Sequence, residues 1–209
     1  MAFLRASIAA ESYVARGAKV ALRPLQMADF GPWAELRTLS RDHLTPFEPV
    51  WPRDELLKSA YRRRLRYYQR EQREDLGYAF GVFTNDTDKL VGGVSLSNVR
   101  RGVTQAGQLG YWLGLPNIRQ GLMADAVATI VPYAFYGLRL HRIEAATLAN
   151  NAPSIRVLER NGFEREGFAR GYLKINGEWR DHILFALIAD DVQSQNAARD
   201  VTRDDVAAL

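Results

Sequence analysis

The first third of the chain carries apolar residues at helical spacing. Residues 28–44 place large apolar side chains three to five positions apart, at Phe30, Trp33, Leu36, Leu39 and Leu44. Residues 54–75 repeat this period, and a proline-rich loop over residues 45–52 separates the two segments. An apolar stripe of this kind packs one face of a helix against a core. We therefore predict two amphipathic helices, preceded by a short strand over residues 19–24.

The rest of the chain alternates between strand and helix patterns. Apolar runs separated by turn-forming residues predict an antiparallel meander over residues 78–84, 90–97 and 107–113. A helix follows over residues 120–136, with a kink because Pro132 has no amide hydrogen to donate. The pattern then predicts a strand over residues 142–148 and a short helix over residues 153–160. A hairpin follows, with strands over residues 168–175 and 179–189. Asn176-Gly177, a pair typical of two-residue turns, joins the hairpin strands.

These elements form one continuous unit. We assign residues 19–189 to a single domain, residues 1–18 to a flexible lead-in and residues 190–209 to a peripheral tail. A chain of 209 residues that is 47% hydrophobic and 25% charged can bury one full core. Neither a membrane-spanning run of roughly 18 apolar residues nor a secretory signal is evident, so we expect a cytoplasmic protein.

The amino-acid composition excludes several kinds of functional site. The chain has no cysteine, which excludes disulfides, thiolate metal ligands and a covalent cysteine intermediate. Its three histidines are not at metal-ligand spacing, so we expect no metal. The net charge of +4 favours acidic or phosphate-rich partners only weakly.

One stretch, residues 108–163, combines a strand, a glycine turn, a helix and a second strand that leads into Asn151 and Ser154. A glycine turn at a helix start offers unpaired backbone N–H groups to a phosphate. Neutral polar side chains from the following element would lie beside it. This arrangement favours a phosphorylated carrier as the ligand.

The same stretch resembles the GNAT acyl-CoA N-acetyltransferase superfamily. Leu109-Gly110-Tyr111-Trp112-Leu113, Asn151-Ala152-Pro153-Ser154 and Asn176-Gly177-Glu178-Trp179-Arg180-Asp181-His182 look like its RimJ/RimL branch, and are closer to RimJ. The resemblance covers about residues 19–189. It implies an α/β (α+β) fold with a mixed, largely antiparallel sheet of six to seven strands and about four helices, splayed at the acetyl-CoA site. It also implies acetylation of the N-termini of ribosomal proteins.

The resemblance assigns acetyl-CoA contacts to the end of one strand and to the glycine turn. The family's diphosphate turn reads onto residues 118–123, where only Gly121 fits strictly and Arg119 replaces a glycine. Main-chain N–H groups hold phosphates in such a turn, so we expect these changes to be tolerated. The expected cofactor-binding residues are Trp112, Leu113, Gly114, Arg119, Gln120, Gly121, Leu122, Met123, Ala124, Asn151 and Ser154.

Two polar residues after residue 148 have competing interpretations. By resemblance, Asn151 would bind the pantetheine arm and Ser154 would protonate the departing thiolate. Alternatively, Asn151 caps the short helix and Ser154 occupies its first turn. Many relatives carry a tyrosine acid where this chain has Leu158, so Ser154 is the remaining candidate acid.

The general base is not obvious. Many relatives have a glutamate where this chain has Gln108, which cannot accept a proton at neutral pH. Deprotonating an α-amine near pKa 8 costs only about 1.4 kcal/mol at neutral pH, whereas a lysine near 10.4 costs more than about 4 kcal/mol. A site without a strong base therefore suits a protein N-terminus. Glu48, in the proline-rich loop, is the carboxylate that we expect either to assist through water or to hold the ammonium, unless it is only an exposed loop acid.

Residues 62–70 form the densest basic segment and interleave arginines with tyrosines. They match either an RNA-contacting surface or the solvated face of a helix whose core stripe is Tyr61, Leu65 and Tyr68.

The sequence predicts an acetyl-CoA-dependent N-acetyltransferase for a protein N-terminus, most simply a ribosomal protein. Two alternatives stay open: an acetyltransferase for a polyamine or aminoglycoside, and a non-catalytic CoA-bound module in ribosome assembly.

Overall fold

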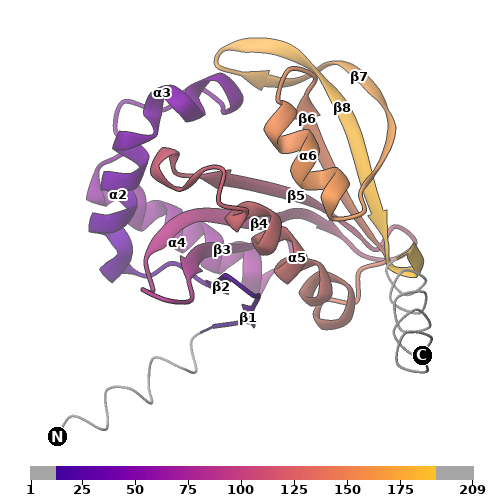
Figure 1. Ribbon diagram of the computed structural model, residues 1–209, viewed down its shortest axis with the longest axis horizontal. Coiled ribbons are helices and arrows are strands. Elements are labelled where there is room, and N and C mark those ends of the chain that lie inside the picture. Colours follow the sequence, from indigo (N-terminus) through magenta and orange to yellow (C-terminus); the bar gives the residue numbers. More distant parts are fainter. Residues whose placement is uncertain (1–12, 192–209) are drawn as a thin grey trace, which may run out of the picture.

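A single mixed sheet organises the molecule (Figure 1). The computed structural model describes residues 13–191, so most of the predicted lead-in and tail lie outside the described residues. The eight described strands follow the order β1-β2-β3-β4-β5-β6-β8-β7. Their bounds are β1 Ala15–Arg16, β2 Val20–Arg23, β3 Tyr78–Thr84, β4 Leu90–Arg100, β5 Ala106–Leu113, β6 Arg142–Leu148, β7 Glu164–Ile175 and β8 Glu178–Ile188. The predicted meander and terminal hairpin are confirmed.

Helices cover both faces of this sheet. One face carries α2 Phe30–Leu39, α3 Arg41–Leu44 and α4 Lys58–Arg73, and the other carries α5 Leu122–Pro132 and α6 Ala152–Arg160. Short turns extend them: η1 Met27–Asp29, η2 Thr45–Phe47, η3 Leu115–Asn117 and the π-helical turn η4 Tyr133–Gly137. None of the helices within residues 13–191 is long and apolar enough to cross a membrane.

The two faces have separate cores. The larger core packs the apolar sides of α5 and α6 against β2 to β6 and β8, and includes Met123, Ile130, Leu158 and Phe185. The smaller core packs Trp33 of α2 and Tyr61 of α4 against Phe83 and Leu90, with Trp112 at its border. Side chains alternate between the two faces of a strand. A strand residue that belongs to one of these cores therefore points to that face of the sheet, and its neighbours in the strand point to the other face.

Several predicted elements differ from the structure, and β7 begins at Glu164 instead of residue 168. The helix predicted over residues 28–44 is divided at Ser40, whose buried hydroxyl accepts the N–H of Leu115 at 2.8 Å. The second helix begins at Lys58 instead of residue 54, because residues 53–56 form turns. The sheet has eight strands instead of six or seven, because β1 pairs with β2 inside the predicted lead-in.

The parallel pair β5 and β6 separates soon after it begins. Ala106 to Gln108 pair with Arg142 to Glu144, and no register continues beyond them although both strands run on. All the other neighbouring strands of the described sheet are antiparallel. The splayed sheet that the resemblance implied is therefore present, and it opens between the carboxyl ends of two parallel strands.

The β7–β8 hairpin reaches the face of the sheet that carries α2, α3 and α4. Asn176 and Gly177 have φ values of +46° and +86°, as a two-residue primed turn requires. The N–H of Asn176 donates to the carbonyl of Glu48 at 2.9 Å. The hairpin tip and the proline-rich loop are thus in contact, and Figure 1 shows the hairpin turn close to α3.

Gly114 allows the end of β5 to pack directly on α2. An added Cβ would overlap the side chain of Leu36. Gly114→Ala should therefore lower the free energy of unfolding by about 1–3 kcal/mol, measured by urea denaturation. Gly31→Ala is the matched control, because a Cβ on Gly31 in α2 meets nothing, and it should stabilise by roughly 0.5–1 kcal/mol. Equal midpoints for the two variants would contradict this packing.

Candidate active site

The gap between β5 and β6 is lined by backbone groups of β5. Gly114 donates its N–H to Val91 of β4 at 2.9 Å. Backbone N–H groups alternate in direction along an antiparallel strand, so the N–H of Leu113 points away from β4, toward the gap. Among the expected cofactor-binding residues of this strand, Leu113 is therefore the one placed to donate to a ligand between the strands.

The start of α5 is an open set of N–H donors. Gly121 is its N-cap residue with φ +76°, no side chain caps it, and Arg119 also has a positive φ of +62°. Leu122 and Met123 bury their side chains in the core, so only their main chain can face a ligand. The turn therefore places main-chain N–H donors at the positive end of a helix dipole, an arrangement that favours an anion.

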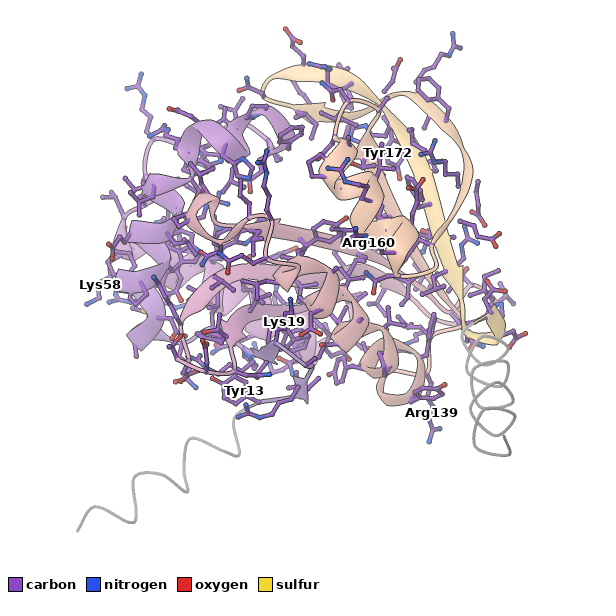
Figure 2. All side chains as sticks on the ribbon, in the orientation of Figure 1. Tyr13, Lys19, Lys58, Arg139, Arg160 and Tyr172 are labelled. Atoms are coloured by element: carbon purple, nitrogen blue, oxygen red, sulfur yellow. The ribbon has the colours of Figure 1, made fainter. Side chains whose placement is uncertain are left out.

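Lys19 lies against this turn, and sequence reasoning did not identify it. Its ammonium donates to the carbonyl of Gln120 at 2.9 Å and lies 3.4 Å from where a Cβ on Gly121 would be (Figure 2). Asp125 of α5 holds this segment by accepting the backbone N–H groups of Ala18, Lys19 and Val20 at 2.8–3.2 Å. Lys19 thus adds positive charge where the helix dipole is already positive. No local pattern marked Lys19, because the contact joins residues about a hundred positions apart.

A buried acceptor atom lies just before the turn. Asn117 Oδ1 in η3 has no hydrogen-bond partner within the described residues. An orphan buried oxygen costs free energy unless a donor reaches it. Together with the uncapped N–H groups, it suits a ligand that has both phosphates and amides, as coenzyme A has.

Ser154 and Asn151 lie on the other side of the gap. Asn151 caps α6 by accepting the N–H of Ser154 at 3.2 Å, so the helix-capping interpretation is confirmed for its side chain. The hydroxyls of Ser154 and Tyr111 are 2.8 Å apart, which bridges β5 and α6 across the gap. Burial raises the pKa of Tyr111 to about 12, although the hydrogen bond to Ser154 opposes this shift. Tyr111 is therefore protonated at neutral pH. Leu158 is 1% exposed and belongs to the core.

Glu48 lies on the opposite face of the sheet, in an ion pair. Arg37 of α2 donates to both of its carboxylate oxygens at 2.7 and 2.8 Å, and Trp51 Nε1 donates at 2.7 Å. The Arg37 guanidinium stacks 4.1 Å from the Trp51 ring and 5.0 Å from the Trp112 ring. Trp112 points to this face because it borders the smaller core. Glu48 is thus neither an exposed loop acid nor an unpaired carboxylate.

The same ion-pair network continues into α4. Arg37 lies 3.4 Å from Glu55, and Glu55 accepts from Arg64 at 2.6 Å. Arg37 and Glu55 are buried, so removing either charge would leave the other uncompensated. This network fixes the loop and the two helices that border the face on which Trp112 lies, which we call the acceptor face.

A row of hydrogen-bonded polar side chains crosses the acceptor face at the point where β5 and β6 diverge. Gln108, at the last β5–β6 pair, accepts from Asn98 Nδ2 at 2.7 Å and donates to the Tyr172 hydroxyl at 3.5 Å. The Tyr172 ring packs edge-on against His182, with centroids 5.7 Å apart. Sequence reasoning missed Tyr172, because bulges in the β7–β8 register decide which way it points. His182 had a signal, since it ends one of the family-like stretches.

Comparison with known proteins agrees with this geometry. A family model described as an acetyltransferase (GNAT) domain matches residues 19–164. The chain belongs to the GNAT acetyltransferase family. It is 39% identical over 176 residues to the probable N-acetyltransferase YjcK of Bacillus subtilis, a match that covers 84% of this chain and 97% of that protein. This confirms the predicted superfamily and acyltransferase class.

Two further matches concern ribosomal-protein acetyltransferases. The chain is 36% identical over 152 residues to the ribosomal protein uS5-alanine N-acetyltransferase of Escherichia coli, a match that covers 73% of this chain and 78% of that protein. The structure of Mycobacterium smegmatis RimJ in complex with CoA-disulfide aligns with a TM-score of 0.78 at 31% identity, over 82% of this chain and 83% of that one. This GNAT acetyltransferase is thus related to enzymes of the RimJ/RimL branch.

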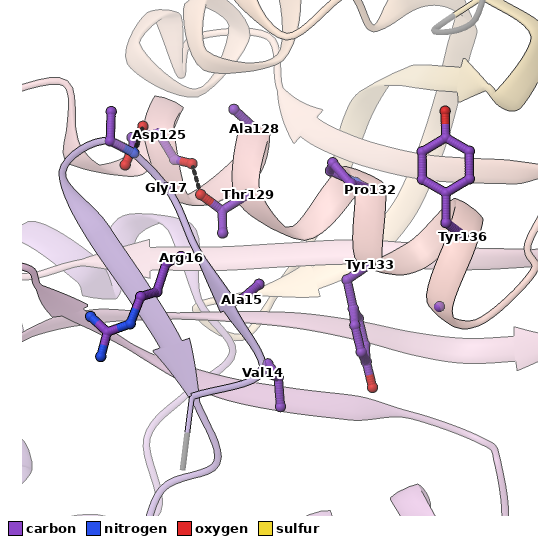
Figure 3. A pocket seen from close by; sticks show the side chains of 12 residues that line it. Val14, Ala15, Arg16, Gly17, Asp125, Ala128, Thr129, Pro132, Tyr133 and Tyr136 are labelled. Atoms are coloured by element: carbon purple, nitrogen blue, oxygen red, sulfur yellow. Dashed lines mark hydrogen bonds between the residues drawn. The ribbon is translucent and has the colours of Figure 1, made fainter. Parts of the chain in front are cut away.

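Two other surfaces of the GNAT domain lie away from the gap. Figure 3 shows a pocket between β1 and α5 that contains Asp125 and Thr129 and none of the predicted site residues. The exposed face of α4 forms a hollow lined by Arg63, Arg66, Tyr67, Gln69, Arg70 and Arg73. Within residues 13–191, no cluster of three or more histidines and carboxylates could hold a metal ion.

The basic helix accounts for the charge of the chain. α4 carries seven Lys and Arg against one Glu, a net +6, whereas the whole chain is +4, so the remainder is −2. Tyr61 and Leu65 are buried, as the core stripe predicted. Most of the arginines lie on the outer face, where Arg63 pairs with Asp54, whereas the half-buried Arg64 pairs with the buried Glu55. RNA contact at this face stays a prediction.

Gly121→Ala tests the turn. A non-glycine residue at φ +76° is strained, by about 1–2 kcal/mol, and its Cβ would also crowd the Lys19 ammonium. Calorimetry should detect weaker coenzyme A binding. Gly102→Ala is the control, since Gly102 has φ +66° and open surroundings, so that it shares the backbone strain but should keep normal affinity. If both variants bind coenzyme A equally well, the turn does not hold the diphosphate.

Proposed function

We propose that this protein transfers an acetyl group from acetyl-CoA to the N-terminal α-amine of a protein, with a ribosomal protein as the expected client. The observation that carries the proposal is the divergence of β5 and β6. It separates a phosphate-binding side, at α5 and α6, from an acceptor face with its own polar groups. A thioester between the strands would meet an amine from the acceptor face, in a ternary complex and without a covalent enzyme intermediate.

Several residues would hold the coenzyme. The main-chain N–H groups from Arg119 to Ala124, with Lys19 beside them, would bind the diphosphate. Asn117 Oδ1 could accept from a pantetheine amide. The side chain of Asn151 would have to bind through its amide N–H groups, because its oxygen caps α6.

The residues around the gap would act on the reacting atoms. The N–H of Leu113 would stabilise the negative charge that develops on the thioester oxygen. Ser154 would give a proton to the departing sulfur and recover one through the Tyr111 hydroxyl 2.8 Å away. Burial raises the pKa of Tyr111 to about 12, so its hydroxyl keeps its hydrogen at neutral pH and can donate a hydrogen bond to Ser154.

Charge on the acceptor face supports a substrate with a single positive group. The carboxylates that border this face, Glu48, Glu55 and Glu144, all accept hydrogen bonds from arginines. A polyamine or an aminoglycoside would have to displace those arginines, whereas one α-ammonium does not need a carboxylate cluster. We therefore assign Glu48 mainly to positioning the wall of the acceptor groove, where an ammonium would compete with Arg37.

The names of the relatives support the client class. The Escherichia coli relative acts on an alanine of ribosomal protein uS5. A ribosomal client would place this protein in the cytoplasm, and would also give the basic face of α4 an RNA partner nearby. RNA binding alone, without acetyl transfer, would instead favour the ribosome-assembly alternative.

Peptide assays test the acceptor. The purified protein should release CoA when it is mixed with acetyl-CoA and peptides that copy ribosomal-protein N-termini, and mass spectrometry should place the acetyl group on the α-nitrogen. The same peptides with a blocked α-amine and an internal lysine are the control, and should react far more slowly because the lysine ammonium costs about 3 kcal/mol more to deprotonate. Faster turnover of spermidine or an aminoglycoside would overturn the proposed client.

Substitutions at the bridging hydroxyls test the acid. Ser154→Ala should lower kcat by about 10²-fold with little change in coenzyme A affinity, as expected for lost general-acid assistance. Tyr111→Phe keeps the ring and removes only the hydroxyl, so it should lower kcat by a smaller factor. An unchanged kcat in Ser154→Ala would remove Ser154 from the reaction.

A further inference from the structure

The acceptor amine arrives as an ammonium, and the position where many relatives have a glutamate is Gln108. We infer that His182, on β8, is the proton acceptor of this site. The inference rests on the proposed function and adds the group that removes the proton. It follows from where the side chain points, which tautomer it has and what lies between it and the point of divergence.

The position of His182 follows from strand alternation. Phe185 and Leu187 belong to the core under α5 and α6, and Ile183 packs against it. His182 therefore points to the opposite face, where Trp112 and Glu48 lie. It pairs with Leu148, the last residue of β6, so it stands beside the open part of the gap.

A backbone carbonyl selects the tautomer. His182 Nδ1 lies 3.0 Å from the carbonyl oxygen of Arg180. A carbonyl oxygen only accepts, so Nδ1 carries the hydrogen and Nε2 has a free lone pair. Imidazole is also the side chain whose ordinary titration lies nearest neutrality, which suits a base that must reset after each turnover.

Neighbouring groups form a polar path to the gap. Tyr172 packs on the His182 ring and its hydroxyl reaches Gln108, which stands at the last paired position of β5. Figure 2 shows Tyr172 on the β7 side of the molecule, from which it extends over the neighbouring strands to Gln108. His182 is 3% exposed, whereas Tyr172 is an exposed residue, so the histidine end of the path is buried and its Tyr172 end is open to solvent.

The charges around the ring are already compensated. On β8, the flanking Arg180 pairs with Glu178, and the flanking Asp181 accepts the N–H of Gly171. On β6, Glu144 faces the same side and pairs with Arg100 and Arg142. From β7, Glu166 also reaches this side and is paired with Arg142. Tyr172 of β7 and Gln108 of β5 contribute a hydroxyl and an amide.

The proton balance of the reaction is complete with this assignment. The ammonium loses one proton to Nε2 of His182 through a bridging water, and the amine nitrogen forms its bond to the thioester carbon as the carbon–sulfur bond breaks. The second proton of the nitrogen goes to the sulfur by way of Ser154. His182 then releases its proton to solvent, so the products are an amide, a thiol and one proton.

The test compares His182→Gln with the wild type across pH. The variant should be about 10- to 100-fold slower at pH 7. The difference in rate between the variant and the wild type should disappear toward about pH 9.5, because the free amine is then already neutral. His141→Gln, at an exposed histidine outside the site, should match the wild type throughout. A rate that falls by the same factor at every pH, or that does not fall at all, overturns the inference. Measurements of coenzyme A affinity and melting temperature identify a misfolded variant.

A measurement on the wild type covers the case in which His182→Gln does not fold. The chain has three histidines, so variants of His43 and His141 assign the imidazole NMR signals. The nitrogen signals of His182 should show a hydrogen on Nδ1 and none on Nε2 in the neutral ring. A neutral ring with its hydrogen on Nε2 would overturn the inference. If the wild type acetylates no peptide at all, the proposed function fails instead, which the same assays distinguish.

Discussion

β5 and β6 stop pairing after three residue pairs, and the site is arranged around the gap that this leaves. Two parallel strands that stop pairing leave backbone N–H and C=O groups without partners, which is unfavourable unless a ligand or side chains use them. Here the Tyr111–Ser154 hydrogen bond spans the gap on one side, and Tyr172 reaches Gln108 on the other. The opening is therefore held by specific contacts, and it connects the two faces of the sheet.

Each face contributes a different part of the site. The face with α5 and α6 has helix-terminal N–H groups, Lys19 and small hydroxyls, which suit phosphates and a leaving sulfur. The face with α2 and α4 has an arginine–carboxylate network that holds the proline-rich loop. The hydrogen bond between Asn176 and Glu48 joins that loop to the terminal hairpin, so the acceptor groove is bordered by elements from both ends of the domain.

Local patterns predicted most of the elements, because they depend on nearby residues. The meander, the Asn176-Gly177 turn and the glycine turn before α5 were predicted from spacing and turn chemistry. The helix predicted over residues 120–136 changes from α-helix to a π-helical turn directly after Pro132. The break at Ser40 was missed, because the hydroxyl that marks it bonds to Leu115, far along the chain. Strand β1 was missed because its two residues carry no alternating pattern of useful length.

Residue types and short spacings were enough to predict the fold family, the glycine turn and the polar residues near the gap. Long-range packing was needed to reveal that Glu48 is bound to Arg37 and that Lys19 contacts the turn. It also places Tyr172 between His182 and Gln108. These contacts join residues far apart in the chain, and bulges and strand register set the direction of their side chains. A one-residue change in register would turn each strand side chain to the other face, and composition does not reveal that register.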